Sequence, residues 1–147
     1  MASQSFCLFI RFDFAICPYT ISCMKVHVRL IQQDLLAKET RIIADTDALL
    51  KENRLSYFEG KQYRHDISFL ENEIVLQRRG DFSSLTRISH LGNGTSEVSS
   101  PYGVMKLDVQ LCDYRQEAGR WMVEYKVMDG TDAASHLKLI WEIVYPA

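Results

Sequence analysis

The chain has 147 residues, of which 47% are hydrophobic, 24% charged and 11% aromatic, and its formal net charge is −2. This length is typical of one domain with a substantial core, and the high hydrophobic content at low net charge argues against disorder. A net charge this small gives no electrostatic reason to expect a nucleic acid or an anionic membrane as a partner.

Residues 1–23 differ in composition from the rest of the chain. Their apolar run is rich in phenylalanine, is interrupted by Arg11 and Asp13, and has no basic residue before it. This pattern is neither that of a signal peptide nor that of a membrane span. Three interpretations remain: a further strand, a poorly ordered tail, or an extension upstream of a true start at Met24. The third is favoured, because strand-like alternation begins at Lys25.

From residue 24 onwards, apolar and polar residues alternate at period two in one segment after another, which is the pattern of half-buried β-strands. The clearest case is 105–128, a hairpin whose two arms flank the polar turn 113–120. In chain order, strands are expected at 26–30, 39–50, 55–59, 64–70, 74–79, 83–91, 95–98, 104–111, 121–128 and 136–145. The stretch 32–38 is expected to be a link and Gly92-Asn93-Gly94 a turn. No segment has a convincing helical stripe and no linker is visible, so residues 24–147 are expected to form one all-β domain.

The regular spacing, about 8–12 residues for each strand with its turn, is typical of a β-sandwich or a closed antiparallel barrel. A barrel removes the exposed edges that a long meander would otherwise present. Hairpin order alone does not distinguish the two, so the sandwich stays open as an alternative.

Three short segments resemble a known family. They are Glu73-Ile74-Val75-Leu76-Gln77-Arg78-Arg79-Gly80, the bend Ser100-Pro101-Tyr102-Gly103 with the alternating strand after it, and the two strands that follow Gly119 and Ala134. On these segments, residue 25 to the end resembles the YwiB-like family of small bacterial proteins. The resemblance implies an antiparallel calycin-like barrel of about eight to ten strands, related in shape to lipocalins and fatty-acid-binding proteins. It also implies a cytoplasmic location, and it brings no established activity or catalytic residues.

Arg78 is the first candidate site residue. It shares the apolar face of its strand with Ile74 and Leu76, so a barrel would direct its guanidinium inwards. A buried cation needs an anion, and the guanidinium fork matches the carboxylate of a ligand such as a fatty acid. The favoured alternative is structural: Arg78 reaches the rim of the barrel or pairs with Glu124 or Glu142.

Five aromatic residues are further candidates for a pocket lining: Tyr57, Tyr102, Trp121, Tyr125 and Trp141. Core packing is the favoured alternative, because the interior of a small barrel is often filled by side chains.

The sequence gives no pattern of a metal centre, a cofactor site or an active site. No two of His27, His65, His90 and His136 have metal-ligand spacing, and all four are expected to face solvent. The four cysteines (Cys7, Cys17, Cys23 and Cys112) form no Cys-x-x-Cys pair, which favours free thiols in a reducing compartment. The chain also lacks a Gly-x-Ser-x-Gly elbow and a P-loop lysine.

The leading functional hypothesis is a non-enzymatic cytoplasmic barrel that binds a small apolar or anionic molecule in its interior. The alternative is a filled barrel that acts through its surface, as a homodimer or a protein-interaction module. The outer face of the last strand, with Ile140 and Val144, is the candidate surface for that role.

Overall fold

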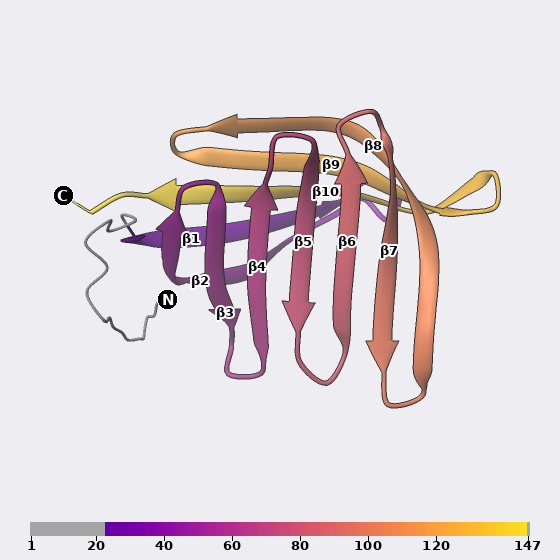
Figure 1. The fold of residues 1–147 in the computed structure, drawn as a ribbon, viewed down its shortest axis with the longest axis horizontal. Helices are drawn as coiled ribbons and strands as arrows, with labels where there is room; N and C mark the ends of the chain where they lie inside the picture. The colour runs from indigo at the N-terminus through magenta and orange to yellow at the C-terminus, as the bar shows by residue number, and fades with distance from the viewer. Residues whose placement is uncertain (1–22, 147) are drawn as a thin grey trace.

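The computed structural model describes residues 23–146, and these residues form an all-β structure (Figure 1). The strands are β1 (Cys23–Asp34), β2 (Glu39–Lys51), β3 (Arg54–Glu59), β4 (Tyr63–Phe69), β5 (Glu73–Arg79), β6 (Ser83–Ser89), β7 (Asn93–Ser100), β8 (Gly103–Glu117), β9 (Arg120–Asp129) and β10 (Asp132–Val144). The three interpretations of the N-terminal segment concern residues 1–23; all of these except Cys23, the first residue of β1, lie outside the described residues. The described part of the chain contains no helix that could cross a membrane.

The ten strands close into an antiparallel barrel in which each strand pairs with its neighbours in the chain. Closure comes from β1, which pairs with both β2 and β10: Val28 lies opposite Thr46 on one side and opposite Ile143 on the other. The prediction of an antiparallel barrel of eight to ten strands is therefore confirmed, and the β-sandwich alternative is excluded.

The barrel is formed by two groups of strands that cross at a steep angle. In Figure 1, β3 to β7 run upright across the front, whereas β1, β9 and β10 run nearly horizontally behind them. The long strand β8 starts beside the upright strands and then curves into the direction of β9. Its register against β9 shifts between Leu111 and Asp113, and a second shift separates Leu30 from Ile31 where β1 pairs with β2. Bulges of this kind let a strand bend from one layer to the other.

Several strand ends differ from the sequence-based predictions, among them β1, which continues to Asp34 and so into the predicted link 32–38. The segment 113–120 was expected to be a polar turn, but β8 continues to Glu117, and its last residues pair with β9. In the predicted turn at 92–94, Asn93 and Gly94 already belong to β7. The last strand begins at Asp132 rather than at 136. In each case, the strand continues through a segment whose composition suggested a turn or a link, because the backbone of that segment pairs with a neighbouring strand.

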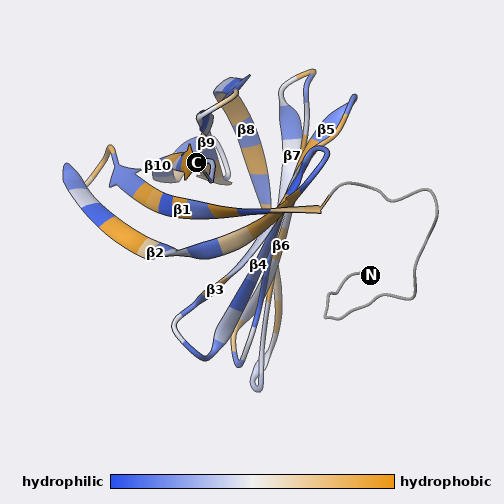
Figure 2. Ribbon diagram, turned by 90° about the vertical axis from the view of Figure 1, so that its left-hand side faces the viewer, coloured by the Kyte–Doolittle hydropathy of each residue, from blue (hydrophilic) through white to orange (hydrophobic). Residues whose placement is uncertain are grey.

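The inner face carries the core, and Figure 2 shows the apolar and polar bands that alternate along the strands. One end of the barrel is filled by aromatic rings: Phe69 packs against Trp121, with centroids 5.1 Å apart, and edge-on against Trp141 at 6.3 Å. At this end, Gln116 donates a hydrogen bond of 3.1 Å to Asn53, which ties the β8–β9 hairpin to the β2–β3 turn. We call this region the closed end.

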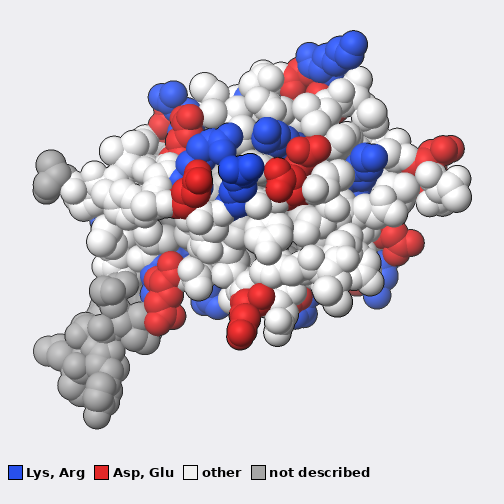
Figure 3. Space-filling view, turned by 90° about the horizontal axis from the view of Figure 1, so that it is seen from above, with Lys and Arg blue, Asp and Glu red and all other residues white. Residues whose placement is uncertain are grey.

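The outer face carries ion pairs between neighbouring strands. Arg29 pairs with Asp45 at 3.3 Å, and Arg87 pairs with Glu73 at 2.7 Å. On the face seen in Figure 3, acidic and basic side chains are interleaved rather than separated. This arrangement agrees with the small net charge and leaves no extended patch of one sign on that face.

Candidate functional site

A cavity of about 390 Å³ lies inside the barrel, away from the closed end. Its apolar wall includes Leu30, Ile67, Leu76, Tyr125, Leu139 and Trp141, and its polar wall includes Gln32, Arg41, Glu59, His65, Arg78 and Thr86. Glu59 is the last residue of β3, and Arg78 is close to the end of β5, so the charged groups mark the mouth. The volume is within the range of small-molecule sites, about 300–1,000 Å³.

Arg78 lies at this mouth, on the inward face that it shares with Ile74 and Leu76, as the alternation predicted. Its Nε lies 3.3 Å from Oε1 of Glu59, and its guanidinium carbon lies 3.7 Å above the ring centroid of Tyr63. The Nε–H is buried, yet it is not aligned for a hydrogen bond with Glu59 or with any other described residue. Arg78 therefore forms an ion pair with Glu59, rather than with Glu124 or Glu142, but its Nε–H has no hydrogen-bond acceptor among the described residues.

His65 is the second polar residue of the mouth. It is only 8% exposed, and its Nε2–H points to Oε1 of Glu59 at 2.8 Å. Its ring stacks on Tyr57, with centroids 4.8 Å apart. Burial lowers the pKa of His65, an effect that the bond to Glu59 only partly opposes. The imidazole is therefore neutral at neutral pH and holds the Glu59 carboxylate in place.

The prediction that all four histidines face solvent is wrong for His65. Period-two alternation puts His65 on the same face as Ile67 and Phe69, which are both buried. This alternation was present in the sequence, but His65 was expected to face solvent because its neighbours Arg64 and Asp66 are polar. His27 does lie on the outside, between Asp45 and Asp47.

The buried His65 predicts acid sensitivity of the fold. Its pKa is lowered in the folded state, so the unfolded chain binds more protons as the pH falls below about 6.5, and stability is then lost. We expect His65→Gln to reduce this loss, measured as the free energy of unfolding in urea between about pH 5 and pH 8. The control is His27→Gln: the pKa of His27 is raised by its bonds to Asp45 and Asp47, so its contribution has the opposite sign. Equal pH slopes in the wild type and His65→Gln would contradict this assignment.

Two predicted aromatic residues line the cavity, and a third supports it. Trp141 and Tyr125 are in its wall, and burial raises the pKa of Tyr125 to about 12. The indole Nε1–H of Trp141 donates a buried hydrogen bond of 2.9 Å to the hydroxyl of Tyr57, which lies behind His65. The other two lie elsewhere. Trp121 packs at the closed end, and Tyr102, on the β7–β8 turn, is 94% exposed.

Several residues of the polar wall were not predicted from the sequence. Glu59 lies two residues after Tyr57 on an alternating strand, so its inward position could have been inferred. Arg41 had no such signal, because the bulge between β1 and β2 changes which residues of β2 face inwards. Within the described residues, Arg41 forms no ion pair.

The surface proposed for the alternative function is not a continuous exposed face. Ile140 is 6% exposed, whereas Val144, further along β10, is 63% exposed. The outer apolar face expected on the last strand is therefore limited to residues near its end.

Comparison with known proteins supports the fold. No protein-family model matches the chain, and no curated protein matches it. Among solved structures, the crystal structure of the YwiB protein from Bacillus subtilis is similar, with a TM-score of 0.61 and 14% sequence identity. The similarity covers 85% of this chain and 92% of that chain. The resemblance predicted from three short segments is thus confirmed at the level of the fold.

Proposed function

We propose that the protein binds a small, partly apolar anion inside the barrel and does not catalyse a reaction. The observation that carries the proposal is Arg78, whose buried Nε–H has no hydrogen-bond partner among the described residues and which lies in the wall of a cavity. Buried donors are almost always satisfied, so one that borders a cavity is available to an acceptor on a ligand.

The charges of the mouth favour an anion. Arg41 and Arg78 each contribute one positive charge, Glu59 contributes one negative charge, and His65 is neutral because of its lowered pKa. One positive charge is left, which a carboxylate would neutralise while its oxygens accept hydrogen bonds from the guanidinium fork. The apolar wall formed by Leu76, Leu139 and its neighbours would bury the rest of the ligand.

The proposal includes a cytoplasmic location. Its support is that the two cysteines within the described residues, Cys23 and Cys112, are both free thiols, as expected in a reducing compartment.

The test compares decanoate with decanol, which have the same chain length and differ in the charged head group. We expect the wild type to bind decanoate at least about tenfold more tightly, a difference of about 1.4 kcal/mol. Arg78→Ala should lose this preference, while its free energy of unfolding changes little. Binding is measured by isothermal titration calorimetry, and native mass spectrometry of protein from its own host would show a retained ligand as added mass.

Arg79→Ala is the matched control, because Arg79 follows Arg78 in β5 but is exposed and donates its hydrogen bond to Gln77. It should keep the preference for decanoate. Equal affinity of the wild type for the acid and the alcohol would contradict the proposal, as would equal losses in the two arginine variants.

A further inference from the structure

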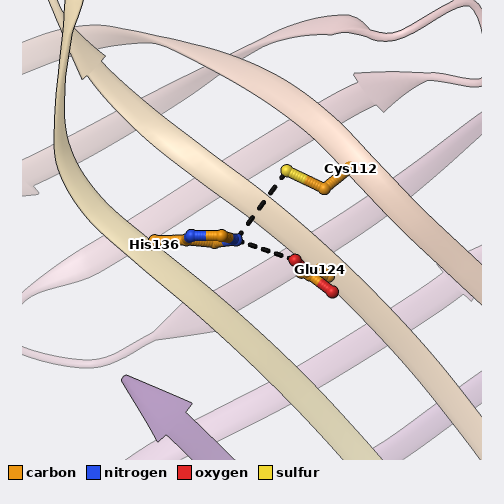
Figure 4. A group of neighbouring side chains, drawn as sticks. All are labelled: Cys112, Glu124 and His136. Carbon is orange, nitrogen blue, oxygen red and sulfur yellow. Dashed lines mark hydrogen bonds and ion pairs between the residues drawn. The ribbon is translucent and has the colours of Figure 1, made fainter. Parts of the chain in front are cut away.

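Three donor side chains converge on the outer side of the barrel, on three consecutive strands (Figure 4). Cys112 lies at the bulge of β8, Glu124 on β9 and His136 on β10. Nε2 of His136 lies 2.8 Å from Oε2 of Glu124 and 3.9 Å from Sγ of Cys112. All three donor atoms lie within 4.8 Å of one another. This cluster is separate from the cavity, and the residues that line the cavity do not include any of the three.

The geometry does not suit a thiol nucleophile. A catalytic histidine uses one ring nitrogen for the nucleophile and the other for the carboxylate that orients it. Here, the same Nε2 faces both Cys112 and Glu124. Burial and the nearby Glu124 carboxylate also raise the pKa of Cys112, which opposes thiolate formation without a bound cation.

Convergence of three donors on one point is instead the arrangement of a metal site. We propose that Cys112, Glu124 and His136 bind a divalent ion of the zinc class, with water in the fourth position. A thiolate, an imidazole and a carboxylate are all zinc ligands, and the thiolate disfavours magnesium and calcium. The donors of a tetrahedral zinc site are about 3.3–3.6 Å apart, by the usual zinc–ligand distances. The separations of 2.8 and 3.9 Å, with an upper limit of 4.8 Å for all three pairs of donors, therefore require side-chain movements of about 1 Å.

The charges and protons of the site balance. Binding releases the thiol proton of Cys112 to solvent, and the proton on Nε2 of His136 moves to Nδ1 as the imidazole becomes a ligand. The thiolate and the Glu124 carboxylate together neutralise the two positive charges of the ion. The ion would join β8, β9 and β10 beside the bulge, where the register of β8 against β9 is interrupted.

No metal site was expected from the sequence, because neither the histidines nor the cysteines have metal-ligand spacing. Glu124 and His136 are 12 residues apart, and Cys112 and His136 are 24 apart. The three residues are brought together by the register of the β8–β9 and β9–β10 hairpins, and the bulge in β8 changes the direction of the Cys112 side chain.

The test uses Co²⁺ as a probe, added to the reduced full-length chain, because a cobalt–thiolate bond gives a charge-transfer absorption band. We expect one Co²⁺ per chain, displaced by Zn²⁺. Cys112→Ser should abolish the band. Glu124→Gln should weaken binding at least about tenfold, since even partners outside the ligand set typically contribute 10–100-fold.

The control is the triple variant Cys7→Ser, Cys17→Ser and Cys23→Ser, which leaves Cys112 as the only thiol and should retain the band. Circular dichroism checks that each variant is folded. Loss of the band in the triple variant, or its persistence in Cys112→Ser, would show that the metal is bound elsewhere. No band in the wild type would overturn the proposal directly.

Discussion

Replacing Gly94 with alanine should destabilise the barrel by about 3 kcal/mol, near the upper limit for an overpacked interior position. Gly94 pairs with Ile88 on β6 and with Val109 on β8. A Cβ at Gly94 would overlap with the carbonyl oxygen of Arg87 and would lie 2.8 Å from the Cα of Ile88. Both are backbone atoms, so the clash is relieved only if β6 and β7 separate. Equilibrium unfolding in urea measures the loss.

Gly119→Ala is the matched control for this clash. An added Cβ at Gly119 would meet nothing closer than 3.6 Å, an ordinary contact with the carbonyl oxygen of Ile143. We expect a change within about 0.5 kcal/mol, as for a substitution that disturbs no contact. If the two variants lost similar amounts of stability, the close approach of β6 to Gly94 would not be the reason that glycine occupies this position.

The strands could be predicted from the sequence because a period-two alternation is a local signal. This signal is least reliable at strand ends, where pairing with the neighbouring strand, rather than composition, determines how far a strand extends, as in β8 beyond Asp113. Closure was not visible locally either. It depends on the register between β1 and β10, such as Val28 opposite Ile143, and these residues are separated by most of the chain.

The residues of the candidate site could likewise be predicted only in part. Alternation correctly placed Arg78 in the cavity wall, because it tells inside from outside. It does not show the height of a residue along the barrel axis, so Trp121 was grouped with Trp141 although only Trp141 also lines the cavity. Tyr102 belongs to a turn, where alternation has no meaning.

The alternation pattern of a single strand does not show whether the barrel is hollow. That depends on the combined volume of the side chains that several strands place at the same height along the barrel axis. Phe69, Trp121 and Trp141 fill the closed end with their rings. Nearer the mouth, β6 and β7 contribute Thr86 and Ser96, two small buried residues whose hydroxyls bond to each other at 2.9 Å. Larger apolar residues at these two positions would occupy more of the interior, so their small size helps to keep the cavity open.

The hydrogen bond between Trp141 and Tyr57 predicts a strongly non-additive pair of substitutions. Trp141 is 1% exposed, and Trp141→Ala should cost about 3–5 kcal/mol through lost packing and the cavity left behind. Trp141→Phe keeps a ring but removes the donor, which leaves the buried Tyr57 hydroxyl unpaired at a cost of about 1–3 kcal/mol. Adding Tyr57→Phe removes that hydroxyl, so the double variant should be less destabilised than the sum of the single variants.

A comparison of Trp141→Phe with Arg78→Ala separates the contributions of these two residues to ligand binding. Trp141 belongs to the apolar wall, whereas Arg78 provides the charge at the mouth. Trp141→Phe should therefore weaken the binding of decanoate and decanol alike and leave their affinity ratio unchanged, whereas Arg78→Ala should change the ratio. Additive unfolding energies in the Trp141 and Tyr57 cycle would contradict the buried hydrogen bond. An altered affinity ratio in Trp141→Phe would show that head-group selectivity does not depend on the charged mouth alone.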